Sequence, residues 1–156
     1  MATKLLFVCL GNICRSPAAE NIMNHLVQEA GIPAGEIVCD SAGTNSYHIG
    51  DSPDRRMQAA AKEKGILMVG KARGFTAADF EKFDLILAMD KENYKGILSY
   101  AKTEKHRSKT ALIMNFAHPK ANEEVPDPYY DGRFELVYQM LDEACEAFLT
   151  QRIAAE

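Results

Sequence analysis

The chain has 156 residues, 47% hydrophobic and 26% charged, which predicts one ordinary globular domain spanning residues 1–156. Its formal net charge of −4 argues against general nucleic-acid binding, because no face is obviously basic enough for a phosphate backbone. No apolar run approaches the length of a membrane span, and the N-terminus lacks a signal-peptide pattern, so a cytoplasmic protein without membrane association is expected.

In chain order, the patterns predict a strand at 5–8, a helix at 17–29, a strand at 37–39, a helix from 52–53 to Gly65, a short helix after a capping box at 76–79, a strand at 83–89, a helix at 91–100, a strand at 111–114 and a last helix at 134–149. This alternation predicts an α/β fold of the Rossmann-like or flavodoxin-like type, a four-stranded parallel sheet with helices on both faces. Ligands bind such sheets beyond the carboxyl ends of the strands.

The most informative segment follows the first strand, where residues 8–17 are Val-Cys-Leu-Gly-Asn-Ile-Cys-Arg-Ser-Pro. A loop between a strand and a helix N-terminus directs backbone N–H groups and the helix dipole at one point, which suits a dianion. Arg15 adds a planar fork of donors for two phosphate oxygens, and Cys9 lies where the same field favours a thiolate. The segment therefore predicts a phosphate-ester hydrolase site. Its expected phosphate-binding residues are Leu10, Gly11, Asn12, Ile13, Cys14 and Ser16.

The spacing of Cys9 and Arg15 alone does not establish catalysis, because a cysteine after a strand is more often a small buried hydrophobic residue. Gly11 supplies conformational freedom, and the pair at 16–17 marks a helix start with Ser16 as a candidate N-cap, which favours the catalytic interpretation.

A second segment, Val-Pro-Asp-Pro-Tyr-Tyr at 125–130, places one carboxylate between two prolines. By itself it is typical of a stiff surface turn packed down by tyrosines. Together with Cys9, it favours Asp127 as the general acid that protonates the departing oxygen of a phosphoester.

The cysteines and histidines complete the inventory of candidate groups. The cysteine pattern is not that of a secreted disulfide framework, and a reducing cytoplasm suits a working thiolate. No histidine has a partner at metal-ligand spacing, so each is expected to be a surface or packing residue, and no metal or other cofactor is expected. The residues concerned are Cys9, Cys14, Cys39 and Cys145, and His25, His48, His106 and His118.

Along essentially its whole length, the chain resembles the low-molecular-weight protein tyrosine phosphatases, which implies their phosphotyrosine phosphatase type I fold. The resemblance rests on Cys-Leu-Gly-Asn-Ile-Cys-Arg-Ser-Pro at 9–17 and Asp-Pro-Tyr-Tyr at 127–130, both highly specific to that family. The motifs Asp-Ser-Ala-Gly-Thr at 40–44 and Ala-Met-Asp at 88–90 also agree.

The resemblance implies that Cys9 forms a cysteinyl-phosphate, that Arg15 clamps the equatorial oxygens, and that Asp127 protonates the tyrosyl oxygen and then activates water. Tyr47 and Tyr129 match the aromatic walls that sandwich the substrate ring. The implied partners are phosphotyrosine-containing proteins, and a monomer is expected.

The supporting residues are also assigned by resemblance. Ser16 would stabilise the thiolate, and Asn12 would hold the loop in shape, partly through the hydroxyl of Ser41. Several family members place a histidine where this chain has Gly70, so the hydrogen bonds around Asn12 are expected to differ. Related enzymes also form a protective disulfide between the cysteines matching Cys9 and Cys14, which implies a redox-sensitive enzyme.

Three alternatives share this architecture. Arsenate reductases need two further cysteines near the third strand, and residues 70–110 contain none. Protein arginine phosphatases carry a threonine where Ile13 stands, and an apolar side chain fits an aromatic ester better than a guanidinium. A phosphocysteine carrier module of sugar transport has no evident use for Arg15 and Asp127, and hydrolysis of an aryl phosphate distinguishes it from an enzyme.

Overall fold

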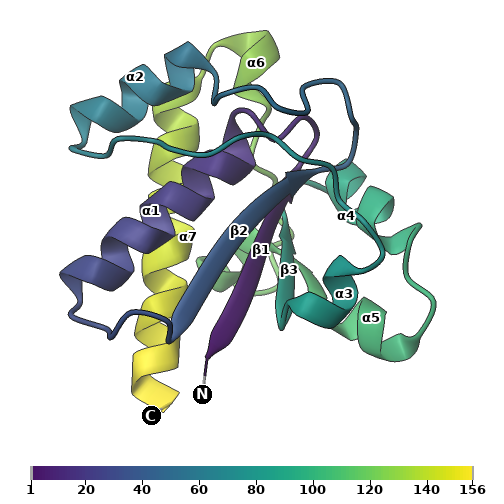
Figure 1. Ribbon diagram of the computed structural model, residues 1–156. Coiled ribbons are helices and arrows are strands. Elements are labelled where there is room, and N and C mark those ends of the chain that lie inside the picture. Colours follow the sequence, from purple (N-terminus) through teal and green to yellow (C-terminus); the bar gives the residue numbers. More distant parts are fainter. Residues whose placement is uncertain (1, 156) are drawn as a thin grey trace.

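The computed structural model describes residues 2–155 and, within them, contains one sheet of four parallel strands, which confirms the predicted fold class. The strands lie in the order β2-β1-β3-β4 (Figure 1). Their bounds are Thr3–Cys9 for β1, Ile37–Gly43 for β2, Leu85–Ala88 for β3 and Thr110–Leu112 for β4. Cys9 pairs in register with Gly43 and Val8 with Ala88, so the carboxyl ends of the three strands β1, β2 and β3 meet at one edge.

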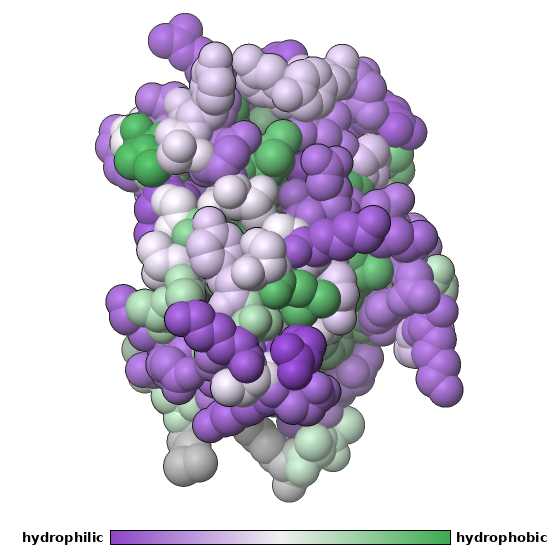
Figure 2. Space-filling view, turned by 90° about the vertical axis from the view of Figure 1, so that its right-hand side faces the viewer, coloured by the Kyte–Doolittle hydropathy of each residue, from purple (hydrophilic) through white to green (hydrophobic). Residues whose placement is uncertain are grey.

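Helices cover both faces of the sheet (Figure 1). On one face lie α1 (Arg15–Glu29), α2 (Arg55–Glu63) and α7 (Phe134–Ala155). On the other lie α3 (Asp79–Lys82), α4 (Lys91–Leu98) and α5 (Glu104–Ser108), and hydrophilic side chains dominate the surface on this side (Figure 2). The remaining short elements are the 3-10 helix η1 (Ile113–Phe116) and α6 (Pro128–Asp131). None of the helices within residues 2–155 is long and apolar enough to cross a lipid bilayer.

The side chains of β1 alternate between two apolar cores. Leu5 and Phe7 belong to the core beneath α1 and α7, whereas Leu6 and Val8 belong to the core beneath α3 and α4. All four side chains are fully buried. A strand buried on both faces must be apolar throughout, which explains the continuous apolar run. Packing on both sides therefore fixes Cys9 at the carboxyl edge of the sheet.

Two helix starts differ from the sequence prediction. α1 begins at Arg15 instead of residue 17, so the prediction that Ser16 is its N-cap is wrong. α2 begins at Arg55 instead of residues 52–53, because the side chain of Asp54 caps it by accepting a hydrogen bond from the backbone N–H of Arg56 at 2.8 Å.

Strand ends and short helices also differ. β2 continues past the predicted end at residue 39 to Gly43, because its main chain keeps pairing with β1 although the side chains become polar. β3 is shorter than the predicted 83–89, and β4 ends at Leu112, where the chain tightens into η1. α5 and α6 were not predicted, because five and four residues are too few to show a helical period.

Candidate active site

The loop at residues 9–15, called here the 9–15 loop, joins β1 to α1 through one left-handed residue. Asn12 has a φ of 58°, a conformation that asparagine adopts more readily than most residues. The end of β2 approaches so closely that a Cβ on Gly43 would lie 2.8 Å from the carbonyl oxygen of Leu10. A glycine is therefore required opposite the loop. The loop lies on the N-terminus of α1, where the helix dipole favours an anion.

The Cys9 thiol is buried, with its Sγ 3.0 Å from the Oγ of Ser16. Asn12 donates a hydrogen bond from Nδ2 to this same oxygen at 2.8 Å. Because Ser16 accepts this bond through an oxygen lone pair, its hydroxyl proton is still available for donation. Two acceptors are in reach of that proton, and the Cys9 sulfur at 3.0 Å is closer than the carbonyl oxygen of Ala42 at 3.4 Å. The geometry thus lets Ser16 stabilise negative charge on the sulfur.

Asn12 also connects the loop to β2 and to the chain after α2. Its Nδ2 donates to the Oγ of Ser41 at 2.9 Å, and its Oδ1 accepts from the backbone N–H of Arg73 at 2.9 Å. Ser41 donates in turn to Oε1 of Glu20 at 2.6 Å. Burial raises the pKa of the Glu20 carboxyl, although the hydrogen bond from Ser41 acts in the opposite direction. A buried asparagine with three side-chain hydrogen bonds is a rigid support for the loop.

Gly70 lies beside a small cavity of about 60 Å³ that Asn12 also lines. Despite the missing side chain at this position, Asn12 has all three hydrogen bonds described above. The main chain that completes them is itself anchored, because the guanidinium of Arg73 pairs with Asp40 at 2.9 Å and with Asp79 at 3.1 Å. The backbone N–H of Arg73, on a fixed segment, thus donates the hydrogen bond that Asn12 Oδ1 needs, and no histidine at position 70 is required.

Arg15 is the largest fully buried side chain of the protein's described part and is surrounded by acceptors. Its Nη1 lies 2.6 Å from Oδ2 of Asp90 and donates to the carbonyl oxygen of Val125 at 3.0 Å, and its Nη2 lies 3.4 Å from Oδ2 of Asp127. Burial would lower the pKa of Arg15, but the negative charges of Cys9, Asp90 and Asp127 outweigh it and raise that pKa. The guanidinium is therefore a permanent, oriented cation.

Asp127 is the N-cap of α6, with Pro128 in the first helical turn. One carboxylate oxygen, Oδ1, accepts a hydrogen bond from the backbone N–H of Tyr129 at 3.1 Å, and the other is the oxygen that pairs with Arg15. The side chain is 24% exposed, so its carboxyl group stays in reach of solvent and of a ligand. The capping bond orients the Asp127 carboxyl group from the helix side, and Arg15 orients it from the loop side.

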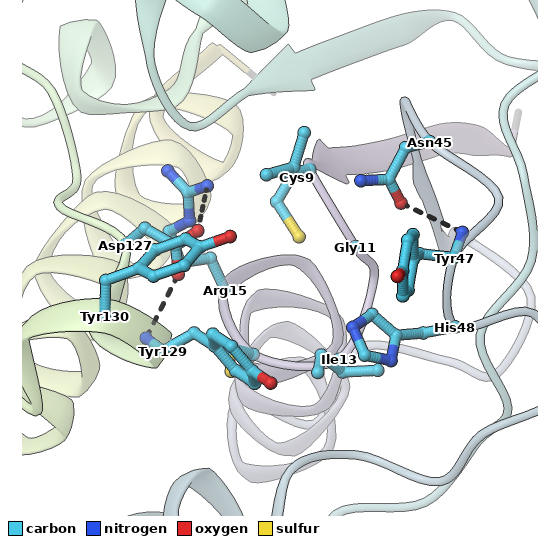
Figure 3. A pocket seen from close by; sticks show the side chains of 12 residues that line it. Cys9, Gly11, Ile13, Arg15, Asn45, Tyr47, His48, Asp127, Tyr129 and Tyr130 are labelled. Carbon is cyan, nitrogen blue, oxygen red and sulfur yellow. Dashed lines mark hydrogen bonds and ion pairs between the residues drawn. The ribbon is translucent and has the colours of Figure 1, made fainter.

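These groups line one cavity of about 190 Å³ (Figure 3). Asp127 and Tyr129 lie on one side of it, Tyr47 lies on the opposite side, and the Cys9 sulfur lies between them. Of the predicted site residues, the cavity lining includes Cys9, Leu10, Gly11, Ile13, Cys14, Arg15, Tyr47, Asp127 and Tyr129. The two others, Asn12 and Ser16, are absent from the lining and support Cys9 and the loop through hydrogen bonds.

A family model for the low molecular weight phosphotyrosine protein phosphatases matches residues 4–156. The chain belongs to this family. It is accordingly a protein tyrosine phosphatase, as the sequence motifs predicted. A Synechocystis sp. protein that is provisionally named a low molecular weight protein-tyrosine-phosphatase is 54% identical to it over 149 residues, 94% of each chain.

Solved structures of related proteins agree with the fold. YfkJ from Bacillus subtilis superposes on this phosphatase with a TM-score of 0.92 at 38% identity, over 100% of this chain and 98% of the other. A drosophila arginine phosphatase superposes with a TM-score of 0.87 at 35% identity, over 96% and 98% of the two chains. The fold is therefore common to proteins that are named for two different phosphorylated residues.

Three residues line the cavity of this phosphatase without having been predicted: Asn45, His48 and Tyr130. Contrary to the expectation of a surface or packing role alone, His48 faces the cavity, 5.8 Å from the ring of Tyr47 and 6.1 Å from that of Tyr129, measured between centroids. Its Nδ1 lies 3.1 Å from Oδ2 of Asp51. The direct adjacency to Tyr47 and Tyr129 in the sequence was the available signal for His48 and Tyr130.

Proposed function

We propose that this phosphatase removes phosphate from phosphotyrosine in proteins through a cysteinyl-phosphate intermediate on Cys9. The observation that carries the proposal is that Cys9, Arg15 and Asp127 line one cavity. A thiolate supplies the nucleophile, a fixed guanidinium offsets the charge on the phosphoryl oxygens, and a carboxyl group moves the proton. The proposed route uses no metal and no other cofactor.

In the first step, the Cys9 thiolate attacks phosphorus, so that an S–P bond forms while the P–O bond to the tyrosyl group breaks. Asp127, in its acid form, gives its proton to the departing oxygen. In the second step, Asp127 as carboxylate takes a proton from a water molecule that attacks phosphorus, the S–P bond breaks and phosphate leaves. Arg15 binds the equatorial oxygens in both steps, and Ser16 stabilises the thiolate that is released.

The walls of the cavity support an aromatic substrate. Tyr47 and Tyr129 stand on opposite sides of the Cys9 sulfur, 88% and 42% exposed, so their rings are free to sandwich a phenyl ring that enters between them (Figure 3). Ile13 adds an apolar contact inside the cavity, which favours an aryl ester over a charged guanidinium. The proposed setting is the cytoplasm, where reducing conditions keep Cys9 reduced, and the proposed form is a monomer.

The test is to trap the intermediate. Wild-type enzyme quenched in acid during turnover of an aryl phosphate should carry one phosphoryl group on the peptide that contains Cys9, as measured by mass spectrometry. Cys9→Ser should show no turnover and should retain phosphotyrosine peptides, because the cradle remains while the nucleophile is lost. Appreciable turnover by purified, folded Cys9→Ser would overturn the mechanism.

A further inference from the structure

Arg56 of α2 lies against two aromatic rings of the segment that follows Asp127, those of Tyr129 and Phe134. Its guanidinium carbon is 5.3 Å from the centroid of the Tyr129 ring and 4.7 Å from that of the Phe134 ring. These rings come from α6 and from the first residue of α7, and α2 and α6 are neighbours at the top of Figure 1. A planar cation over an aromatic face is held by the ring's quadrupole and by stacking.

Arg56 is held in turn by Asp54, the N-cap of α2. Nη2 of Arg56 donates to Oδ2 of Asp54 at 3.0 Å and Nε donates to Oδ1 at 3.2 Å, so both carboxylate oxygens fix the guanidinium plane. Burial opposes ionisation of Asp54, but the hydrogen bonds from Arg56 outweigh it and lower the pKa of that carboxyl. The pair therefore stays ionised at neutral pH.

Asp54 also contacts the 9–15 loop directly. Its backbone N–H donates to the carbonyl oxygen of Ile13 at 2.8 Å. One continuous chain of contacts thus runs from the loop that carries the nucleophile, through Asp54 and Arg56, to the rings of Tyr129 and Phe134. Arg56 itself is absent from the cavity lining, so it is in position to support the site without touching substrate.

The residues after Asp127 have few other attachments. The main chain just before it is fixed, because Val125 donates to the carbonyl oxygen of Met89 at 2.9 Å and accepts from Arg15 at 3.0 Å. Within the described residues, the hydrogen bonds of residues 128–133 close on the segment itself, on Asp127 or on the first turn of α7. The position of α6 therefore depends on side-chain packing, which includes the contact of the Arg56 guanidinium with the rings of Tyr129 and Phe134.

We propose that Arg56 is a positioning residue for the general acid: it seats α6 against the 9–15 loop so that Asp127 reaches the leaving oxygen. The proposal rests on the proposed function, because it takes Asp127 as the acid. Asp127 accepts a hydrogen bond from the backbone of Tyr129 at 3.1 Å, so any displacement of Tyr129 moves the carboxylate with it. In the first step, a misplaced acid slows only the reactions whose leaving group needs its proton.

The experiment compares Arg56→Ala with Arg55→Ala, its neighbour on α2, which is exposed and has no ion pair or ring contact among the described residues. With phenyl phosphate, Arg56→Ala should lower kcat/KM, which reports the first step alone, by up to about 100-fold, because a displacement of 1 Å is enough for such a loss. With a dinitrophenyl phosphate, whose leaving group departs unprotonated, the loss in kcat/KM should be small. Arg55→Ala should behave as wild type, and Arg56→Lys should recover part of kcat/KM.

Arg56→Gln provides a second variant of similar size, and thermal unfolding of each protein checks that it is folded. In an Asp127→Ala background, Arg56→Ala should cause no further loss with phenyl phosphate, because there is no acid left to position. Equal losses of kcat/KM with both substrates, or an undiminished loss in that background, would overturn the role of Arg56. If Asp127→Ala alone lost kcat/KM equally with both substrates, the acid assignment would fail first, and the Arg56 proposal would fall with it.

Discussion

The 9–15 loop and the segment at 127–134 both contribute to the cavity, but they are held in different ways. The loop lies between β1 and α1. The side chain of one of its residues, Asn12, makes three hydrogen bonds, to Ser16, to Ser41 and to the main chain of Arg73. The 127–134 segment is far away in sequence and has few hydrogen bonds to the rest of the molecule. It rests on side-chain packing and on the pair between Asp127 and Arg15.

This difference matches what each region has to do. The loop must present a preorganised cradle to a phosphoryl group, and rigid hydrogen bonds achieve that at no cost during the reaction. In the proposed mechanism, Asp127 must reach a leaving oxygen whose protein context varies from one substrate to the next. The two regions should therefore respond differently to substitution, the loop losing activity with every substrate and the segment losing it selectively.

Arg15→Ala tests the cradle and should have the largest effect. Phosphoryl transfer that loses its arginine typically slows by about 10³–10⁵-fold, and among residues 2–155 no other Arg or Lys lines the cavity to offset the charge on the equatorial oxygens. The loss in kcat/KM should be similar for phenyl phosphate and for a dinitrophenyl phosphate, since both require the cradle. A selective loss with the poorer leaving group would instead assign Arg15 to the positioning of Asp127.

Asp127→Ala tests the segment. With phenyl phosphate, kcat/KM, which reports the first step alone, should fall by about 10²–10⁴-fold, the usual contribution of general acid catalysis. With the acidic dinitrophenol as leaving group, the loss in kcat/KM should shrink, because protonation of that oxygen is unnecessary. The measurement is the dependence of log(kcat/KM) on leaving-group pKa, which should steepen in the variant. Parallel lines for wild type and variant would mean that Asp127 is structural.

The same contrast explains how much of the site the sequence revealed. Cys9, Arg15 and the loop between them are contiguous, so a strand, a spacing and a helix start predicted their convergence. Asp127 lies more than a hundred positions away, and its link to Cys9 was inferred from chemistry and resemblance, because nothing local indicates where the segment folds back.

Contacts between distant side chains left still less signal. His48 had no metal-ligand partner in the sequence, yet its ring lies near the rings of two tyrosines of the cavity, Tyr47 and Tyr129. The stack of Arg56 on Tyr129 and Phe134 depends on where α2 begins, and that depends on the cap at Asp54, which the sequence prediction missed in favour of residues 52–53. A helix start that is wrong by two or three residues gives the cap to the wrong side chain, and here the cap residue Asp54 is the one that holds Arg56.

Asn12→Ala tests the rigidity of the loop with an intermediate effect. Loss of the hydrogen bonds to the buried hydroxyls of Ser16 and Ser41 and to the backbone N–H of Arg73 should lower the free energy of unfolding by about 2 kcal/mol or more, and kcat should fall by about tenfold. Asn122→Ala is the matched control, because Asn122 is exposed and also left-handed, with a φ of 52°. It should share the backbone strain without the loss of activity. Equal kcat losses in both would refute the special role of Asn12.

Ile13→Thr tests specificity within the loop and should have a smaller effect. Ile13 is only 8% exposed and lines the cavity, where its apolar side chain favours a phenyl ring. Wild type should hydrolyse a phosphotyrosine peptide in preference to a phosphoarginine peptide. The variant should narrow the ratio of kcat/KM values by about tenfold, the order of magnitude of one apolar contact in a pocket. A wild type that prefers phosphoarginine would make the arginine phosphatase the correct alternative.

Oxidation of wild type and of Cys14→Ser tests whether the 9–15 loop can move enough for Cys14 to form a disulfide with Cys9 and so protect it. Peroxide should inactivate wild type reversibly through a Cys9–Cys14 disulfide, whereas Cys14→Ser should remain mostly inactive after a dithiol is added. Burial, aided by the nearby charge of Asp54, raises the pKa of the Cys14 thiol, so at neutral pH it is almost wholly protonated. Because the Cys14 thiolate is the species that attacks the oxidised Cys9, the rate of disulfide formation should rise about tenfold per pH unit. This should hold for as long as the pH stays below the raised pKa of Cys14. Mass spectrometry after timed oxidation at several pH values measures this rate, and equal recovery of both proteins, or closure that slows as pH rises, would count against a protective Cys14.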